Sequence, residues 1–446
     1  MPSRPASPSR VYVHTLGCPK NEADSRSLSR SLAASGAVLV PTPEQATHIL
    51  LNTCGFIKEA KEESIGAILD ACASYADKRV LVMGCLVERY RDELRGGIPE
   101  VSAWFGLAGG DDERALLREL GTEASHVGSL AREEAAETLD RSRAGYAYLK
   151  ISDGCDEPCT FCAIPGIKGP YHSVDAAGIV EEARACLADG ARELVLVGQD
   201  TTLWRDHDLD LFGLIDLLAQ DERVRRLRVM YLQPERVTDA FLRHMARQPK
   251  LCRYLDVPFQ HSHPDILRRM GRWGDGDAYL GLVERARRLM PEVAIRSSFI
   301  VGFPGETEEH FEHLLSFVRD VGFDYAGGFV YSPEEETAAA KLKPRVRQSI
   351  AQERLNRLNE LLELSAESRH HALVGAHMEV MIDSLDAEEA GEGISAVGRT
   401  AGQAPDVDGV TYVEGGLPEG TMPGDVLTVT VDAVVGYDLM GTVNAP

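Results

Sequence analysis

The sequence predicts a mixed α/β protein with three domains: an open parallel α/β domain, a partial (β/α)6 barrel and a small terminal β-barrel. Three observations lead to this fold class. Apolar runs alternate with helix-like stretches from residue 11 to about 125, six strand candidates alternate with helical segments from Tyr146 to about Tyr331, and short alternating strands with Gly and Pro turns fill the last segment. The predicted domains are residues 10–140, 144–370 and 371–446. A chain of 446 residues is long enough to bury the cores of several domains.

In the first region, three apolar runs of strand length each end at a cysteine. The runs are VYVHTLGC, HILLNTCGF and VLVMGC, which carry Cys18, Cys54 and Cys85. Because the carboxyl ends of strands in an open α/β sheet line one crevice, these thiols can converge although 36 and 31 residues separate them. Sequence spacing alone would leave them as three unrelated buried thiols. A stretch rich in Ala, Glu and Arg near 131–144 has no strand character and is predicted to be a linker.

In the second region, six strand candidates alternate with helical segments. They read YLKIS, ELVLVG, LRVMYL, YLDVPF, IRSSFIVG and YAGGFVY. Six units favour an open, partial barrel, and such barrels place their chemistry at the carboxyl ends of the strands. A long helix over roughly 346–370 then leads to the terminal domain, for which we expect a five-stranded barrel. One face of that helix carries Ile350, Leu355, Leu358 and Leu362.

Directly after the first barrel strand, Cys155, Cys159 and Cys162 fall within eight residues. At the cysteine frequency of this chain, a given three-cysteine spacing arises by chance only roughly 0.004 times, so the pattern is treated as selected. A structural zinc site requires four ligands, and the nearest candidate for the fourth is His172. A 4Fe-4S cube with three protein thiolates leaves one iron open to an exogenous ligand. We therefore expect an iron–sulfur cluster with an open iron here, with zinc as the alternative.

Polar residues at other strand ends face the same mouth of the predicted barrel. Four of them follow the second and fourth strands: Gln199, Asp200, Gln260 and His261. Each is ambiguous alone, and for Gln199, Gln260 and His261 hydrogen bonds to strand-end backbone are as good an explanation as contacts with a cofactor or substrate. Arg296 is a candidate partner for a cofactor carboxylate, with an internal ion pair as the alternative. The turn from Gly302 to Glu306 precedes a helix, and its alternative role is purely structural.

The remaining three cysteines, Cys72, Cys186 and Cys252, are predicted to be core positions. Nine cysteines in a chain without a secretory signal are expected to be thiols or metal ligands, because the cytosol keeps thiols reduced. No apolar run approaches the roughly 18 residues that a membrane span needs, so we expect a cytoplasmic protein without a membrane partner.

The spacing Cys155-x-x-x-Cys159-x-x-Cys162, with Phe161 before the last cysteine, resembles the signature of radical S-adenosylmethionine enzymes. This resemblance implies a partial barrel and a 4Fe-4S cluster whose open iron chelates S-adenosylmethionine. Electron transfer from the cluster would release a 5′-deoxyadenosyl radical that abstracts hydrogen. The candidate cofactor-binding residues are then Phe161, Gln199, Gln260, Arg296 and Gly302, and no catalytic residue is expected beyond the clusters.

A wider pattern resembles the methylthiotransferases over nearly the whole chain. It comprises TLGCPKNEADS around Cys18, NTCGF around Cys54, the Gly84-Cys85 pair, the radical signature and the small terminal β-domain. The resemblance implies a second, auxiliary 4Fe-4S cluster on Cys18, Cys54 and Cys85, whose open iron carries the sulfur donor. The implied reaction uses S-adenosylmethionine once to methylate sulfur and once to make the radical that activates a substrate carbon, with an external protein as electron donor.

Two substrate classes are known for this family: an adenosine of transfer RNA and an aspartate of the twelfth small-subunit ribosomal protein. The segments LGCPKN, YLDVPFQH and FIVGFPGETEE resemble the ribosomal-protein branch. They predict methylthiolation of an aspartate β-carbon, with a transfer RNA methylthiotransferase as the alternative. A third interpretation, a non-catalytic iron–sulfur electron carrier, predicts no binding of S-adenosylmethionine.

Charge separates the two substrate classes. The net charge of 47 minus 70, or -23, argues against a general nucleic-acid binder, and from His371 onward 1 basic and 13 acidic residues give -12. The terminal domain resembles a TRAM domain, a module often associated with RNA binding. Its charge would repel phosphate and attract a Lys- and Arg-rich ribosomal protein, unless the acidity only aids solubility. The family pattern also predicts a Ser-Arg pair where this chain has Ser173 and Val174, which leaves a basic contact there without support.

Overall fold

The computed structural model describes residues 9–121, 145–385, 391 and 393–444, which form two compact units. The first unit contains the described residues up to 121 together with 163–170, and the second contains 145–162 and everything from 171 onward. The linker predicted near 131–144 lies within 122–144, outside the described residues. No helix in the described part of the chain is both long and apolar enough to span a membrane.

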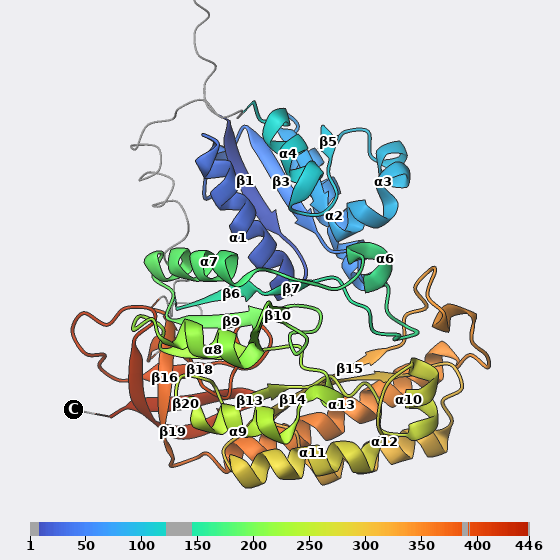
Figure 1. Cartoon of the computed structure of the whole chain (residues 1–446), viewed down its shortest axis with the longest axis vertical. Coiled ribbons are helices and arrows are strands. Elements are labelled where there is room, and N and C mark those ends of the chain that lie inside the picture. The colour runs from blue at the N-terminus through green and yellow to red at the C-terminus, as the bar shows by residue number, and fades with distance from the viewer. Residues whose placement is uncertain (1–8, 122–144, 386–390, 392, 445–446) are drawn as a thin grey trace, which may run out of the picture. The chain divides into compact units, whose positions relative to one another are not determined.

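The first unit is built on a five-stranded, fully parallel sheet with the order β2-β1-β3-β4-β5 (Figure 1). Its strands are β1 (Arg10–Thr15), β2 (Val38–Leu39), β3 (His48–Thr53), β4 (Arg79–Gly84) and β5 (Ala103–Trp104). β3 is buried along its whole length because helices cover both faces of the sheet. One core is formed with α1 (Pro19–Ala34) and α4 (Gly110–Glu119), and the other with α2 (Lys58–Ser74) and α3 (Cys85–Gly97).

A short helix from the barrel part of the sequence also belongs to the first unit. This is α6 (Ile164–Lys168), which packs against α3. Its Lys168 forms a buried ion pair with Asp24 of α1, with 3.3 Å between Nζ and Oδ2. The chain therefore enters the first unit a second time, directly after Cys162.

The second unit begins with six parallel strands that follow one another in sequence order. They are β6 (Tyr146–Lys150), β9 (Glu193–Val197), β12 (Arg226–Val229), β13 (Tyr254–Asp256), β14 (Ala294–Val301) and β15 (Tyr325–Val330). Backbone hydrogen bonds join them as two three-stranded sheets, which adjoin where Leu227 bridges Leu251. The strand number and the open, partial barrel agree with the sequence prediction.

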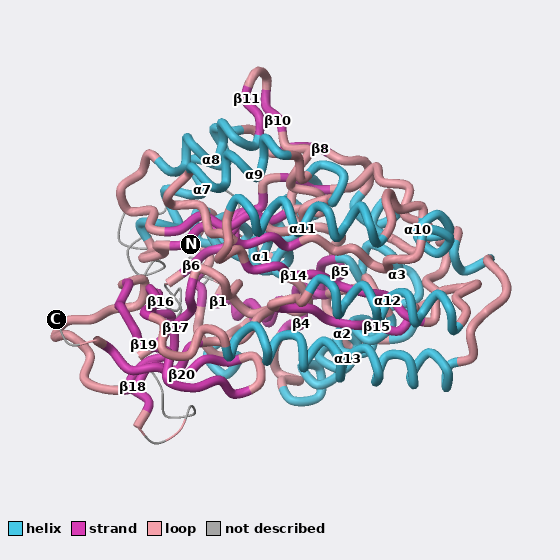
Figure 2. The backbone as a smooth tube through the Cα atoms, turned by 90° about the horizontal axis from the view of Figure 1, so that it is seen from below, coloured by secondary structure: helices cyan, strands magenta, loops and turns pink. Residues whose placement is uncertain are grey.

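Helices pack on the outside of these strands. Figure 2 draws the helices in cyan and the strands in magenta. The outer helices are α7 (Ala176–Ala188), α8 (Leu211–Ala219), α9 (Asp239–Arg247), α10 (Pro264–Met270), α11 (Gly276–Leu289), α12 (Glu308–Val321) and α13 (Gln348–His371). Side chains of Asp or Thr cap five of their amino ends, each worth about 1 kcal/mol: Asp175, Asp210, Thr238, Asp275 and Thr307. The long helix predicted over 346–370 corresponds to α13, which buries Leu358 and Leu362.

The last five strands close into a small barrel with the order β16-β17-β18-β20-β19, as predicted. They are β16 (His377–Ser384), β17 (Ile394–Thr400), β18 (Thr411–Glu414), β19 (Val426–Val435) and β20 (Asp438–Val443). A loop of this barrel, residues 401–410, reaches polar side chains of the (β/α) barrel. Tyr148 donates to Pro405 O at 2.7 Å, and Tyr254 donates to Asp408 Oδ2 at 2.6 Å.

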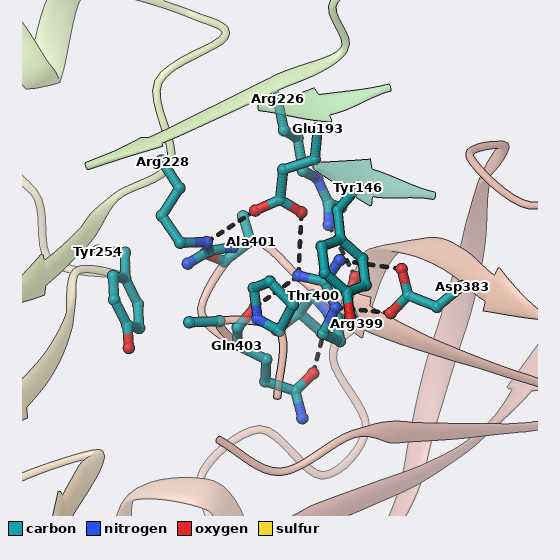
Figure 3. Close-up of polar contacts among 12 residues, drawn as sticks. Tyr146, Glu193, Arg226, Arg228, Tyr254, Asp383, Arg399, Thr400, Ala401 and Gln403 are labelled. Atoms are coloured by element: carbon teal, nitrogen blue, oxygen red, sulfur yellow. Dashed lines mark hydrogen bonds and ion pairs between the residues drawn. The ribbon is translucent and has the colours of Figure 1, made fainter. Parts of the chain in front are cut away.

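A buried carboxylate joins the two barrels of the second unit. Glu193 of β9 accepts bonds from Arg228 Nε at 2.7 Å and from Arg399 Nη1 at 3.0 Å, and all three side chains are at most 2% exposed. Arg399 also binds Asp383 of β16 at 2.6 Å (Figure 3). These charges therefore fix the terminal barrel to the amino ends of β9 and β12.

Candidate functional site

Three cysteines at neighbouring strand ends of the first unit, here called the strand-end trio, converge: Cys18, Cys54 and Cys85. Cys18 caps α1 after β1, Cys54 follows β3, and Cys85 begins α3 after β4. Cys18 acts electrostatically on Cys54, and both act on Cys85. Adjacent parallel strands therefore bring together residues that are far apart in the sequence.

A glycine beside each of these cysteines lets the loops touch. A Cβ on Gly17 would lie 2.5 Å from Cys54 Cβ, and one on Gly55 would lie 2.6 Å from Leu86 Cα. Gly84 has φ +104°, and its Cβ would lie 2.5 Å from Thr53 O. Real Cβ atoms do not approach so closely, so the convergence of the trio depends on these glycines.

Two thiols of the strand-end trio, Cys54 and Cys85, are buried, and the charges of Lys20 and Lys168 act on them. Burial raises the pKa of the Cys54 thiol, and it raises the pKa of Cys85 to about 12, while Lys168 acts in the opposite direction on Cys85. Without a metal these groups are neutral thiols. A metal ion or cluster that used them as ligands would have to displace their protons.

The other three cysteines, here called the loop trio, lie in the loop after β7 (Ser152–Asp153): Cys155, Cys159 and Cys162. The carboxyl end of α10 supports this loop. Thr160 donates through N to Met270 O at 2.9 Å and through Oγ1 to Arg269 O at 2.8 Å. Two sulfurs accept hydrogen bonds: Cys155 from Glu157 N at 3.5 Å, and Cys159 from Arg272 Nη1 at 3.7 Å.

In the described part of the chain, neither trio belongs to a group tight enough to hold a single metal ion. A zinc ion bound at about 2.3 Å holds its sulfurs close together, whereas a cube places each thiolate on its own iron. Among the described residues, the group whose ligand atoms all lie within 4.8 Å of one another is His263, Asp265 and His310, and it includes no cysteine. His172 is exposed and pairs with Asp153 across β8 (His172–Ser173), so the zinc alternative gains no support.

Two of the candidate cofactor residues lie at strand ends with unusual features. Gln199, two residues past β9, has a buried Oε1 without a hydrogen-bond partner among the described residues. Gln260 has φ +68°, and its backbone N donates to Ser298 O at 2.9 Å. An orphaned amide oxygen and a strained backbone are both features of ligand-binding positions. Phe161 packs edge-on against Phe303, with 6.5 Å between the ring centroids.

Arg296 and Gly302 have structural explanations. Arg296 lies in the amino-terminal half of β14, where it binds Asp256 at 3.0 Å and Asp408 at 3.1 Å. This is the internal ion pair that the sequence left as the alternative, at the end of the strand opposite the cysteine loop. A Cβ on Gly302 would lie 2.5 Å from Ala351 Cβ of α13, so helix packing accounts for this glycine.

Ion pairs fix the turn after β14 and the loop that carries the loop trio. Glu306 pairs with Arg354 of α13 at 2.8 Å, and burial raises the pKa of Glu306 to about 7 although Arg354 opposes the shift. Arg236 binds Glu157 at 2.6 Å and the buried Asp200 at 3.0 Å. Asp200 therefore has the structural role that the sequence left open.

Sequence reasoning missed three residues of this site: Gln233, Arg236 and Arg272. Gln233 has a buried Oε1 without a partner among the described residues, and it follows β12 as Gln199 follows β9. Its position after a strand could have marked Gln233 as a candidate in the sequence. Nothing in the sequence marks Arg236 or Arg272, because tertiary contacts alone bring them to the cysteines.

Comparisons with known proteins agree with this geometry. Residues 10–106 match the Uncharacterized protein family UPF0004, residues 149–318 match the Radical SAM superfamily, and residues 374–443 match the TRAM domain. The chain is 39% identical over 445 residues to the ribosomal protein uS12 methylthiotransferase RimO of Anaeromyxobacter sp. strain Fw109-5, covering 98% of this chain and 93% of that protein. The chain belongs to the RimO family. The RimO of Thermotoga maritima is 40% identical over 446 residues, covering 97% and 100%.

Solved structures share the fold of this RimO-family chain. The radical S-adenosylmethionine methyltransferase TsrM of Kitasatospora setae aligns with a TM-score of 0.54 at 14% identity, covering 75% of this chain and 77% of that one. The radical enzyme OxsB aligns with a TM-score of 0.51 at 13% identity, covering 80% of this chain and 56% of that one.

The family match and the RimO relatives confirm the predicted membership. This is a radical S-adenosylmethionine methylthiotransferase of the branch that acts on ribosomal protein uS12, with S-adenosylmethionine and 4Fe-4S clusters as cofactors.

Proposed function

We propose that this enzyme adds a methylthio group to the β-carbon of an aspartate in uS12, using one cluster on each cysteine trio. The observation that carries the proposal is the presence of two separate three-thiol sites in a chain of the RimO family. Three thiolates leave one iron of each cube open. The loop trio then holds the cluster that binds S-adenosylmethionine, and the strand-end trio holds the cluster that carries the sulfur donor.

At the loop trio, the chain's own residues bind and orient the cofactor. When bound, the cluster and S-adenosylmethionine supply a carbon radical that abstracts hydrogen from the substrate. Gln199 and Gln260 lie at strand ends on the same side of the barrel as this loop, where their amides serve as cofactor contacts. α10 and Arg236 fix the loop itself through Thr160 and Glu157. Reduction of the cluster requires an electron-donor protein.

Substrate choice follows from the charge of the terminal barrel. Its exposed acidic residues face solvent and suit a Lys- and Arg-rich protein better than phosphate: Glu379, Glu419, Asp425 and Asp432. Transfer RNA is therefore not the expected substrate. Because uS12 is a component of the ribosome, we place the reaction in the cytoplasm.

Mass spectrometry of both substrate classes tests the proposal. The anaerobically reconstituted enzyme is incubated with S-adenosylmethionine, a sulfur source and reductant, together with uS12 in one reaction and transfer RNA in another. We expect the methylthio mass on one aspartate of uS12 and none on RNA. A methylthio group on adenosine would assign the enzyme to the other substrate class.

Cysteine variants test the division of labour between the trios. The parent should bind about eight irons per chain, in two clusters of four. Cys159→Ala should abolish formation of 5′-deoxyadenosine, whereas Cys54→Ala should retain it, bind about half the iron and stop sulfur insertion. Cys72→Ala, on α2 and outside both trios, is the control and should match the parent. Equal loss of 5′-deoxyadenosine in Cys159→Ala and Cys54→Ala would contradict the assignment.

A further inference from the structure

Arg272 contacts a sulfur of the loop trio. Its Nη1 lies 3.7 Å from Cys159 Sγ, and its Nη2 donates to Pro258 O at 2.8 Å. We propose that Arg272 is a positioning residue that hydrogen-bonds the Cys159 thiolate and raises the reduction potential of the cluster on the loop trio. This inference rests on the proposed function, because it assumes a cluster at that trio.

The end of α10 is shaped to bring Arg272 to the cysteine loop. Gly271 adopts φ +68°, and Arg272 N donates back to Leu267 O at 2.8 Å, which ends the helix. A Cβ on Gly271 would lie 2.3 Å from Pro158 O, so only glycine permits this approach to the loop. The two bonds from Thr160 to the last carbonyls of α10 fix the same contact from the other side. Arg272 is therefore held in place by the backbone that precedes it and by the loop that it contacts.

The charge of Arg272 is directed at the sulfur rather than at a carboxylate. The other arginine of the site, Arg236, binds the carboxylates of Glu157 and Asp200, which offset its charge. The Arg272 guanidinium instead donates to Cys159 Sγ and to a backbone carbonyl. A neighbouring carboxylate, Glu235, acts on Arg272 only electrostatically and more weakly than Cys159 does.

A cation at this place acts differently on the two redox states. Reduction adds one electron, and hence one negative charge, to the cluster. A guanidinium that donates to a cluster sulfur stabilises the more negative state more strongly, and hydrogen bonds to sulfur are known to set cluster potentials. Removing the guanidinium should therefore make the cluster harder to reduce.

A redox titration of the full chain tests this inference. The strand-end trio is first changed to alanine so that only the cluster on the loop trio is observed, and the protein is titrated without S-adenosylmethionine, with dithionite as the one-electron donor. In this background, Arg272→Gln should lower the equilibrium constant of reduction about tenfold, which is about 59 mV for one electron. Arg268→Gln is the matched control, because Arg268 lies on the same helix but is exposed and binds Asp265. The equilibrium constant of reduction of Arg268→Gln should stay within about twofold of that of the background.

The lysine variant separates charge from a general structural role. Arg272→Lys keeps the positive charge, so its equilibrium constant of reduction should stay within about threefold of that of the background. Four bound irons and an unchanged potential in Arg272→Gln would overturn the inference and leave the proposed function intact. If Arg272→Gln does not retain four irons, the result for Arg272→Lys decides. An Arg272→Lys protein that binds four irons and has a reduction potential near that of the background supports the inference. A tenfold change in its equilibrium constant of reduction, or failure to bind four irons, overturns the inference. A background protein without any cluster would overturn the proposed function and this inference together.

Discussion

At the scale of single residues, the convergence of the strand-end trio requires glycine, which has no side chain, next to the cysteines. The loops that carry Cys18 and Cys54 approach so closely that Gly17 has no room for a Cβ. Asn21 adds a bridge between the same loops, because its Nδ2 donates to Leu16 O at 2.8 Å and to Thr53 O at 3.3 Å. The thiols therefore reach one another only while the backbone around them stays compact.

The variant Gly17→Ala tests this dependence. The added methyl would collide with Cys54 at a position whose φ of +97° already disfavours any other residue. We expect the iron content to fall from about eight toward about four per chain, while 5′-deoxyadenosine is still formed. Gly66→Ala is the control: Gly66 lies in α2, where an added Cβ would have nothing within 4 Å, and the change should leave the iron content unaltered. Full iron content in Gly17→Ala would show that the loops can separate without loss of the cluster.

At the scale of elements, a buried ionic network fastens the terminal barrel to the (β/α) barrel. Its central residue is Glu193, which lies between Arg228 and Arg399 with all three side chains almost fully buried (Figure 3). Separating such partners is costly, because any charge left behind remains out of water. The terminal barrel is thus a fixed part of the second unit rather than a tethered module.

Glu193→Gln should destabilise the second unit strongly. The change leaves Arg228 and Arg399 buried without their carboxylate, which costs about 3–5 kcal/mol in comparable buried pairs. Urea unfolding of the iron-free protein measures the loss. Glu222→Gln, an exposed site in the same unit, should change the unfolding free energy by less than about 0.5 kcal/mol. Similar values for both variants would mean that the network contributes specificity of packing rather than stability.

The same carboxylate predicts a dependence of stability on pH. Burial alone would raise the pKa of Glu193, but Arg228, Arg399 and Arg226 outweigh it and lower the pKa from 4.5 to about 2. A depressed pKa gives a stabilisation that is complete above the ordinary value and is lost as pH falls from about 4.5 to about 2. Unfolding free energies measured across this range should fall more steeply in the parent than in Glu193→Gln. Parallel slopes would exclude Glu193 as the titrating group.

At the scale of the whole molecule, the acidic charge has two uses. Some carboxylates of the terminal barrel form internal ion pairs, since Asp383 binds Arg399 and Asp408 binds Arg296. Others, including Glu419 and Asp432, are exposed. The internal group stabilises the second unit, and only the exposed group is available to a basic substrate.

Reversing exposed charge should weaken recognition of uS12 without changing the chemistry. The double variant Glu419→Lys with Asp432→Lys should raise KM for uS12 about tenfold at low salt, with kcat little changed, because charge complementarity acts mainly on encounter. Added salt should reduce the difference, since screening shortens the range of these charges. Glu59→Lys with Asp70→Lys changes the net charge equally on exposed positions of α2 and should have no such effect. Equal effects of both pairs would point to overall charge rather than to a surface.

The sequence by itself determined the fold class, the strand count of both barrels and the family, because hydrophobic periodicity and short cysteine spacings are local signals. It also indicated that Cys18, Cys54 and Cys85 converge, since the carboxyl ends of parallel strands share one edge. Only the tertiary structure decided the contacts of Arg296, Asp200 and Arg272. Their partners lie between about 36 and 113 positions away in the sequence, and no periodic pattern encodes such a pairing. Local order follows from neighbouring residues, whereas the partner of a buried charge is fixed only when distant elements pack together.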